Sequence, residues 1–315
     1  LMILGQGAIR CHPYVLREMN AAKDKDKRRS LREFDRALFG HIGYTLSNAA
    51  RSFVMAATFA RFSHAPDTGS TRRYFQHVNK FSAQFAFATD MAMLTLGGYL
   101  KQKEHLSARL GDVLSSLYMA SMVLKHYENQ GRPEADLPLV EWSCRNLLYK
   151  AQEQMHGFLR NFPNRWVAGL MRVVVFPRGR TYFAPSDRLG RRIVEPLMVP
   201  SESRERLSHG IYKTVEPGNP IGLLQEALVL SMSAEPLEKR LRVEGVKTGR
   251  ITALDLPGQI EQAVSIGLLN AAEAQLLRDY DRKVMDIVNV DDFSTEELMA
   301  GVQAESTAQP LRQIA

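Results

Sequence analysis

The amino-acid sequence predicts an all-α protein, in which a helical bundle is followed by short helices. Apolar residues recur at the three- and four-residue spacing of helices over most of residues 1–176. After Pro177, further prolines divide the chain at short intervals. The sequence has no internal repeat and no strand-rich region, because its single β-like run, residues 173–176, continues a helical pattern.

The N-terminal part predicts two helical stretches. The first runs through Ile9 and ends near Ala22, and the charged run 23–29 (KDKDKRR) is expected to be a solvated loop. The second covers residues 31–62 and stops at the turn 65–69, which contains proline and glycine.

Four helices are expected to form the bundle, or half of a larger one. Two apolar stripes flank Gly97-Gly98 and predict an antiparallel pair. A third helix starts near Leu137, with Pro138 in its first turn, and a short apolar fourth covers residues 164–176. The stripes consist of Tyr74, Val78, Phe81, Phe85, Ala88 and Ala92, and of Leu106, Leu110, Val113, Leu114, Leu117, Ser121 and Leu124.

The C-terminal part predicts shorter helices. Asn219 and Pro220 predict the cap and first turn before a helix over residues 223–232. Two more helices are predicted over residues 252–266 and 270–288. Asn270 with Glu273, and Ser294 with Glu297, have the spacing of capping boxes. The predicted divisions are 1–62 (connecting helices), 63–215 (bundle with a basic segment), 216–300 (short helices) and 301–315 (loose tail).

Composition indicates a globular protein of a reducing compartment, which we expect to be the cytoplasm. The chain has 315 residues, of which 45% are hydrophobic and 24% charged, and two distant cysteines that form no disulfide framework. The apolar start, residues 1–4, is too short for a signal peptide, and the sequence opens on Leu1 rather than Met in the middle of an apolar run. We therefore expect Leu1 to be an internal position of a longer protein. Residues 85–100 contain Asp90 and predict a buried helix rather than a membrane span.

Charge is concentrated in one segment. Residues 160–213 contain eleven basic residues against four acidic ones, an excess equal to the net charge of +7 for the whole chain. Residues 273–305 are acidic, with nine acids against three basic residues. The basic and acidic segments could face each other in the folded protein.

The basic segment contains the candidate contact residues. Arginines flank the apolar run 166–176, so this helix could lie in a membrane surface with its arginines on anionic headgroups. The residues alone favour a simpler interpretation, a core helix whose arginines pair with acids of the segment 273–305. Nucleic-acid binding is the weakest alternative, because no reading motif accompanies the charge. The candidate membrane or partner contacts are Arg165, Trp166, Arg172, Arg178 and Arg180.

No motif predicts a catalytic, cofactor or metal site within this chain. Gly5-Gln6-Gly7 lacks the third glycine of a dinucleotide fingerprint, and the adjacent Cys11 and His12 cannot form a nucleophile pair by themselves. The eight histidines are scattered without a metal-binding spacing. The acidic pairs Asp279/Asp281 and Asp291/Asp292 indicate a solvated face rather than a calcium loop.

Several strings together resemble the C-terminal part of the long bacterial acyl-CoA dehydrogenases of fatty-acid β-oxidation. The resemblance covers nearly the whole chain, from Leu1 to about Leu298. The strings are, in order, GQGAIRCHPY (5–14), SARLGDVLS (107–115), EADLPLV (134–140), NFPNR (161–165), APSDRLG (184–190) and NVDDF (289–293).

The resemblance implies a reaction whose machinery lies mostly elsewhere. The whole enzyme would oxidise a fatty acyl-CoA to a trans-2-enoyl-CoA, with a glutamate removing the α-proton, FAD accepting hydride and an electron-transferring flavoprotein receiving the electrons. In this family the glutamate lies in a Glu-Gly motif just before the stretch that matches Leu1. No Glu-Gly precedes Gly5, so no catalytic or flavin-binding residue is carried over.

The same resemblance implies a location and partners. Residues 1–62 would comprise the end of the catalytic helical domain and connecting helices, with residues 1–14 leaving the catalytic domain. The remaining residues would form an extra helical domain associated with the membrane surface and with a homodimer. We expect peripheral contact with the inner membrane and no nucleic-acid partner. The alternative is a non-catalytic helical module that docks on an anionic membrane or a protein partner.

Overall fold

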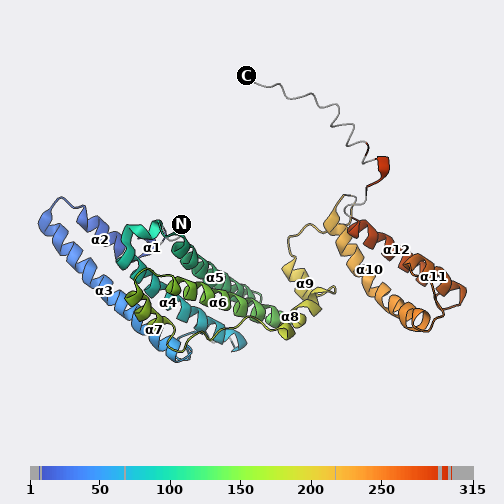
Figure 1. Ribbon diagram of the computed structural model, residues 1–315, viewed down its shortest axis with the longest axis horizontal. Coiled ribbons are helices and arrows are strands. Elements are labelled where there is room, and N and C mark those ends of the chain that lie inside the picture. The colour runs from blue at the N-terminus through green and yellow to red at the C-terminus, as the bar shows by residue number, and fades with distance from the viewer. Residues whose placement is uncertain are drawn as a thin grey trace, which may run out of the picture. The chain divides into compact units, whose positions relative to one another are not determined.

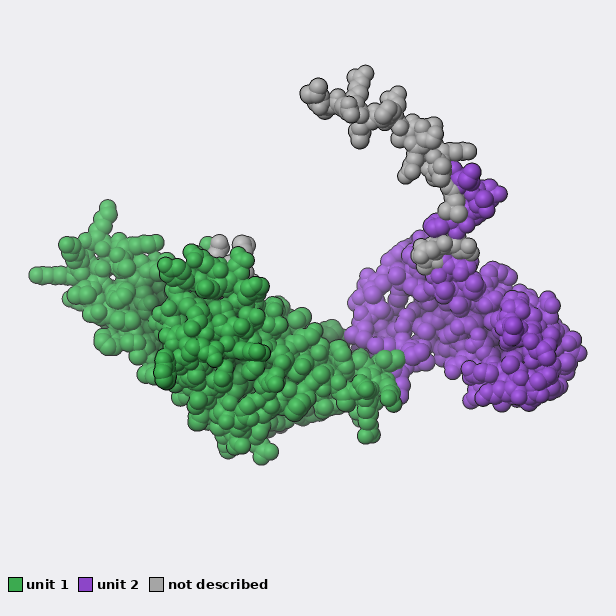
Figure 2. Space-filling view, viewed as in Figure 1, with its two compact units in different colours: residues 1–194 green, residues 195–315 purple. Residues whose placement is uncertain are grey.

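The structure is a computed structural model that describes residues 7, 9–66, 69–216, 218–289, 293–296 and 299. It divides into two compact units, residues 1–194 and 195–315 (Figure 2). All regular structure in the described residues is helical, which confirms the predicted all-α class. The predicted division at residues 62, 215 and 300 stays a prediction.

Unit 1 is a bundle of long helices (Figure 1). α3, α4, α5 and α6 pack against one another in sequence order, α2 packs on α3, and α7 packs on α3 and α6. Gly97, at φ 49°, ends α4 with a backbone conformation that other residues rarely adopt. The helices are α1 (Ile9–Cys11), α2 (Val15–Ala22), α3 (Lys27–Ala57), η2 (Gly69–Thr71), α4 (Arg72–Leu96), η3 (Gly97–Lys101), α5 (Glu104–Asn129), η4 (Glu134–Asp136), α6 (Leu137–Arg160), α7 (Arg165–Val175) and α8 (Asp187–Val194).

The core of unit 1 is formed by the predicted apolar stripes. Most stripe residues of α4 and α5 are buried, and they meet the large apolar side chains of α6 and α7. No described helix has both the length and the apolarity that crossing a membrane requires. Residues 85–100 instead contribute Phe87, Ala88 and Ala92 to this core, as expected for a buried helix.

Unit 2 has a separate small core. α10 packs on α12, and α11 packs on α12. Asn270 and Glu273 form the predicted capping box, in which each side chain accepts a hydrogen bond from the other residue's backbone N–H. The elements are η5 (Glu195–Leu197), α9 (Glu202–Leu207), α10 (Pro220–Arg240), η6 (Leu241–Val246), α11 (Leu256–Ser265) and α12 (Ala271–Val288).

Several predicted boundaries were wrong. The helix expected over residues 9–22 is interrupted at Pro13, which has no N–H to continue it. The charged run is only partly a loop, because the side chain of Asp26 accepts N–H bonds from Arg28 and Arg29 and so starts α3. Pro236, expected to break the chain, lies inside α10.

Some predictions fall outside the described residues. These are the Gly5-Gln6 part of the glycine motif, the Asp291/Asp292 pair, the second half of the Ser294/Glu297 capping box and the tail after residue 300.

Candidate functional site

The first part of the candidate site is the amphipathic helix α7. The side chain of Asn164 accepts hydrogen bonds from the backbone N–H groups of Trp166 and Val167, at 3.1 and 3.2 Å, and this cap starts the helix. At the other end, Ser52 of α3 and Gln84 of α4 donate hydrogen bonds to the carbonyl oxygens of Val174 and Val175. α7 is therefore held in one orientation on the bundle.

That orientation gives α7 a buried face and an exposed apolar face. Ala168, Met171 and Val175 are buried in the core. On the exposed face, Trp166 is 91% exposed, Leu170 55% and Val173 60%. Because these three residues follow the i, i+4, i+7 spacing, they form one contiguous strip, which we call the α7 stripe.

Two of the predicted arginines flank the α7 stripe. Arg165 donates a hydrogen bond to the carbonyl oxygen of Arg160 at 3.2 Å. Arg172 makes no ion pair with any described residue. The structure therefore brings Arg165, Trp166 and Arg172 together on one exposed helix.

The other two arginines hold the segment after α7 against the bundle. Arg178 Nε donates to the carbonyl oxygen of Ala57 at 2.7 Å, and its guanidinium lies 5.2 Å from the ring centre of Phe59. Arg180 forms an ion pair with Glu153 of α6 at 3.2 Å. In unit 2, Glu273 pairs with Arg240 and Asp279 with Arg282, so these two acids of the acidic segment 273–305 have cationic partners in their own unit.

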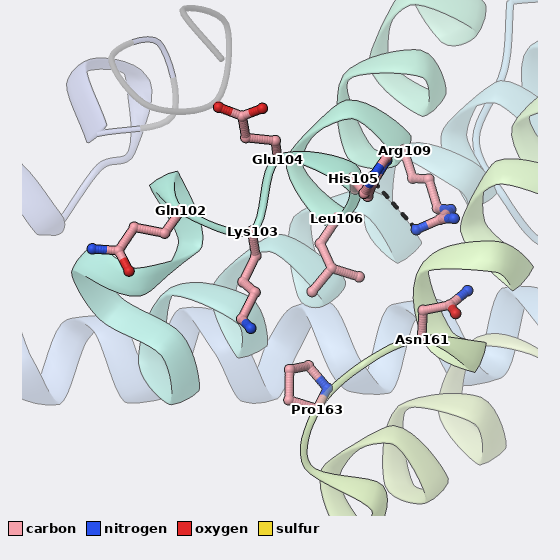
Figure 3. A pocket seen from close by; sticks show the side chains of 8 residues that line it. All are labelled: Gln102, Lys103, Glu104, His105, Leu106, Arg109, Asn161 and Pro163. Carbon is pink, nitrogen blue, oxygen red and sulfur yellow. Dashed lines mark hydrogen bonds between the residues drawn. The ribbon is translucent and has the colours of Figure 1, made fainter.

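A pocket of about 500 Å³ lies in unit 1 between the start of α5 and the loop before α7 (Figure 3). Residues 102–106 and Arg109 line one side, and Asn161 and Pro163 line the other (Figure 3). Arg109 donates a weak hydrogen bond to the carbonyl oxygen of His105, and a Cβ on Gly157 would lie 3.1 Å from Arg109 Nε. The strings SARLGDVLS and NFPNR, far apart in sequence, thus meet at one pocket.

Sequence reasoning missed a cluster of three potential metal ligands. His12, His41 and Asp90 offer ligand atoms that all lie within 4.8 Å of one another. Asp90 also accepts a hydrogen bond from Thr45 at 3.1 Å, and His41 Nδ1 lies 2.9 Å from a carboxylate oxygen of Glu18. The cluster joins helices α2, α3 and α4 to the His12-Pro13 turn.

The hydrogen bonds of His12 do not fit metal binding. Its Nδ1 accepts the backbone N–H groups of Tyr14 and Val15, at 3.2 and 3.1 Å. Burial lowers the pKa of His12 and so favours its neutral ring. Because Nδ1 accepts hydrogen bonds, the proton of the neutral ring lies on Nε2, which donates to Asp90 at 3.0 Å. A protonated Nε2 has no lone pair to offer a metal ion. We therefore interpret the cluster of His12, His41 and Asp90 as a hydrogen-bonded contact between helices.

One common dinucleotide-binding feature is not found in the described residues. A dinucleotide pyrophosphate is commonly held where a strand passes through a glycine-rich loop into a helix, and the described residues form no strand. We therefore assign no flavin contact and no step of flavin chemistry to them.

Comparison with known families identifies the chain. A family model for the acyl-CoA dehydrogenase C-terminal domain, bacterial type, matches residues 9–293. No solved structure matches the chain. The family match agrees with the helical architecture and with the resemblance carried by the quoted strings, and it indicates an oxidoreductase of dehydrogenase type. The chain thus belongs to the bacterial-type acyl-CoA dehydrogenase C-terminal family.

Proposed function

We propose that the chain is the C-terminal helical portion of an FAD-dependent acyl-CoA dehydrogenase. The whole enzyme would oxidise fatty acyl-CoA to trans-2-enoyl-CoA in fatty-acid β-oxidation and pass electrons to an electron-transferring flavoprotein. The observation that carries this proposal is the family match over residues 9–293. FAD, when bound, would accept the hydride, and most of its binding residues and the catalytic glutamate would lie upstream of Leu1.

Flavin content and activity test the enzymatic part of the proposal. The chain alone and the longer product that includes the coding sequence upstream of Leu1 are purified and compared. We expect flavin absorbance and acyl-CoA-dependent dye reduction only in the longer product. A colourless and inactive longer product would overturn the enzyme assignment, and flavin bound by the chain alone would overturn the placement of the cofactor.

For the chain itself we propose docking on an anionic membrane surface through α7. The α7 stripe exposes an indole and two aliphatic side chains, and Arg165 and Arg172 are exposed on the same helix. An interfacial helix combines such an apolar face with cations that approach lipid phosphates. This surface would localise the enzyme at the inner membrane without crossing it.

Vesicle flotation tests the docking surface. Trp166→Ala removes the largest apolar group, and Arg172→Glu reverses one charge, so each should weaken binding to phosphatidylglycerol vesicles roughly tenfold. Tyr118→Ala and Lys125→Glu, two exposed residues of α5, are the matched controls and should bind as the unchanged chain does. Docking through α7 would be contradicted if the α7 variants and the α5 controls lost vesicle binding equally, or if no variant lost it.

A protein partner is supported by a second exposed surface. On α3, Phe39, Leu46 and Phe53 are 72%, 65% and 43% exposed and recur every seven residues, with Ile42 between the first two. A heptad stripe is self-complementary between two helices, so we propose that a second copy covers it in a homodimer. Sedimentation equilibrium of Leu46→Lys should show a monomer, whereas Leu94→Lys on α4 should not change the association state.

A further inference from the structure

A second pocket of unit 1, of about 470 Å³, lies on the side of the bundle where α3 ends and α4 begins. The turn after α3, the first turns of α4, the middle of α6 and the segment after α7 all contribute to its lining. Its volume lies in the range of small-molecule sites.

The pocket concentrates positive charge without a matching carboxylate. Arg61, Arg73 and Arg145 line it, and the lining contains no acidic residue. None of these three guanidinium groups forms an ion pair with any described residue. Arg145 Nε instead donates to the hydroxyl oxygen of Tyr74, which also lines the pocket. Three arginines converging on one cavity are a typical arrangement for binding phosphate groups.

One wall of the pocket is a strained turn. Phe59 and Ala60 have φ values of 52° and 58°, a left-handed conformation that costs free energy for residues other than glycine. The turn is held from α4, where Arg73 donates to the carbonyl oxygen of Phe59 at 2.8 Å and Gln76 donates to those of Arg61 and Ser63. These bonds fix Phe59 and Arg61 at the pocket.

Another part of the pocket lining is fixed by a buried amide. Gln152, which is 1% exposed, accepts hydrogen bonds from the backbone N–H groups of Thr181 and Tyr182, at 2.7 and 2.9 Å. Its amide nitrogen donates to the carbonyl oxygen of Tyr182 at 2.9 Å. This clamp holds the segment that presents Phe183, a ring that is 79% exposed at the pocket.

His77 adds a neutral side chain to the lining, and a buried amine lies next to Tyr182. The Tyr182 hydroxyl lies 2.8 Å from Nδ1 of His77, and burial together with the charges of Lys80 and Arg73 lowers the pKa of His77 to about 3. The neutral His77 therefore accepts this hydrogen bond and keeps its Nε2 proton. The ammonium nitrogen of Lys80, which does not line the pocket, lies 4.4 Å from the centre of the Tyr182 ring.

We propose that this pocket is a nucleotide site, with Arg61, Arg73 and Arg145 binding the phosphate groups and the rings of Phe59, Tyr74 and Phe183 contacting the base. Arginine provides several N–H donors to phosphate oxygens, and aromatic side chains offer faces on which a base can stack. The site is separate from the α7 stripe and does not depend on the proposed oxidoreductase activity.

Calorimetric titration of the full chain with ADP, pyrophosphate and adenosine tests the site. We expect ADP to bind with a Kd at or below about 0.1 mM, pyrophosphate more weakly and adenosine weakest. Arg61→Gln and Arg145→Gln should each weaken ADP binding about tenfold, because each removes one charge-assisted contact. Phe183→Ala should weaken ADP binding and leave pyrophosphate binding unchanged.

Arg72→Gln is the matched control. It removes the same charge from the neighbouring position of α4, where the exposed side chain does not line the pocket, and should bind ADP as the unchanged chain does. Circular dichroism confirms that each variant is folded. The proposal is overturned if ADP does not bind, or if Arg72→Gln weakens ADP binding as much as Arg61→Gln does. It is also overturned if Arg61→Gln weakens vesicle flotation but not ADP binding, because that result would indicate a lipid phosphate as the ligand.

Discussion

The hydroxyl of Tyr182 donates a hydrogen bond to Nδ1 of His77, at 2.8 Å, across 105 residues of sequence. Burial raises the pKa of Tyr182 and lowers that of His77, so both groups stay neutral over a wide pH range. This bond joins the irregular segment after α7 to the first half of α4. It thereby connects two walls of the arginine-lined pocket.

Removal of this hydroxyl should destabilise unit 1. Tyr182→Phe keeps the ring and leaves Nδ1 of His77 without its donor, which should reduce the free energy of unfolding by about 1–2 kcal/mol. Urea denaturation followed by circular dichroism measures the change. Tyr118→Phe, at a residue that is 65% exposed on α5, serves as the control and should change stability by less than about 0.5 kcal/mol.

Lys80 should make stability depend on pH. Its side chain is 4% exposed, and burial, together with the charge of Arg73, lowers its pKa to about 7 from the ordinary value of 10.5. Between these values the unfolded chain binds more protons than the folded chain, so stability rises with pH. Below the folded-state pKa the full cost of the buried ammonium is present, on the order of a few kcal/mol.

Lys80→Met should therefore raise the thermal midpoint, and by more near pH 6.5 than near pH 9.5. His77 is neutral throughout this window, because its pKa is lowered to about 3, and Tyr182 is protonated. The ring contacts of Lys80 with Phe81 and Tyr182 offset part of the cost of its charge. Scanning calorimetry at the two pH values measures the difference, and a gain independent of pH would contradict this account.

Loss of the Gln152 side-chain amide should lower the free energy of unfolding of unit 1. In Gln152→Leu, two backbone N–H groups and one carbonyl of residues 181–182 lose their hydrogen-bond partner. We expect the free energy of unfolding to fall by about 2–4 kcal/mol. Gln154→Leu on the same helix is the control. Hydrogen exchange should show the amides of Thr181 and Tyr182 losing protection in the first variant and keeping it in the second.

The two cysteines should react at very different rates. Cys11 is exposed, whereas Cys144 is fully buried and its burial raises the pKa of the thiol to about 12. An aromatic disulfide reagent should label one thiol in the folded chain and two in urea. Cys11→Ser should abolish the rapid reaction, and rapid labelling of both thiols in the folded chain would contradict the packing of α6.

Local patterns predicted the helices well because helical spacing and capping are local properties. The cap of α12 by Asn270 and the core face of α5 needed only neighbouring residues. The start of α3 differs from the prediction because a run of charges is typical of a loop, whereas the side chain of Asp26 caps a helix within that run. The break at Pro13 differs because the apolar spacing continues through a residue that cannot donate a helical hydrogen bond.

The sites depend on contacts between distant residues, and the sequence offers little signal for these. His12 and Asp90 are 78 residues apart, and Arg61, Arg73 and Arg145 belong to no common motif. The exposed face of α7 was predictable from spacing, but the ion pair of Arg180 with Glu153 was not. Only the packing of α6 against the segment after α7 brings those two charges together.

The separate cores of the two units have a consequence for folding during synthesis. The buried cluster of unit 1 extends from Phe81 to Val175, and that of unit 2 begins only at Ala234. Ribosomes add about 5–20 residues per second, so the first cluster can close seconds before the second has been made. Each nascent unit would then bury its apolar surface in turn, and a chaperone would have less exposed chain to shield.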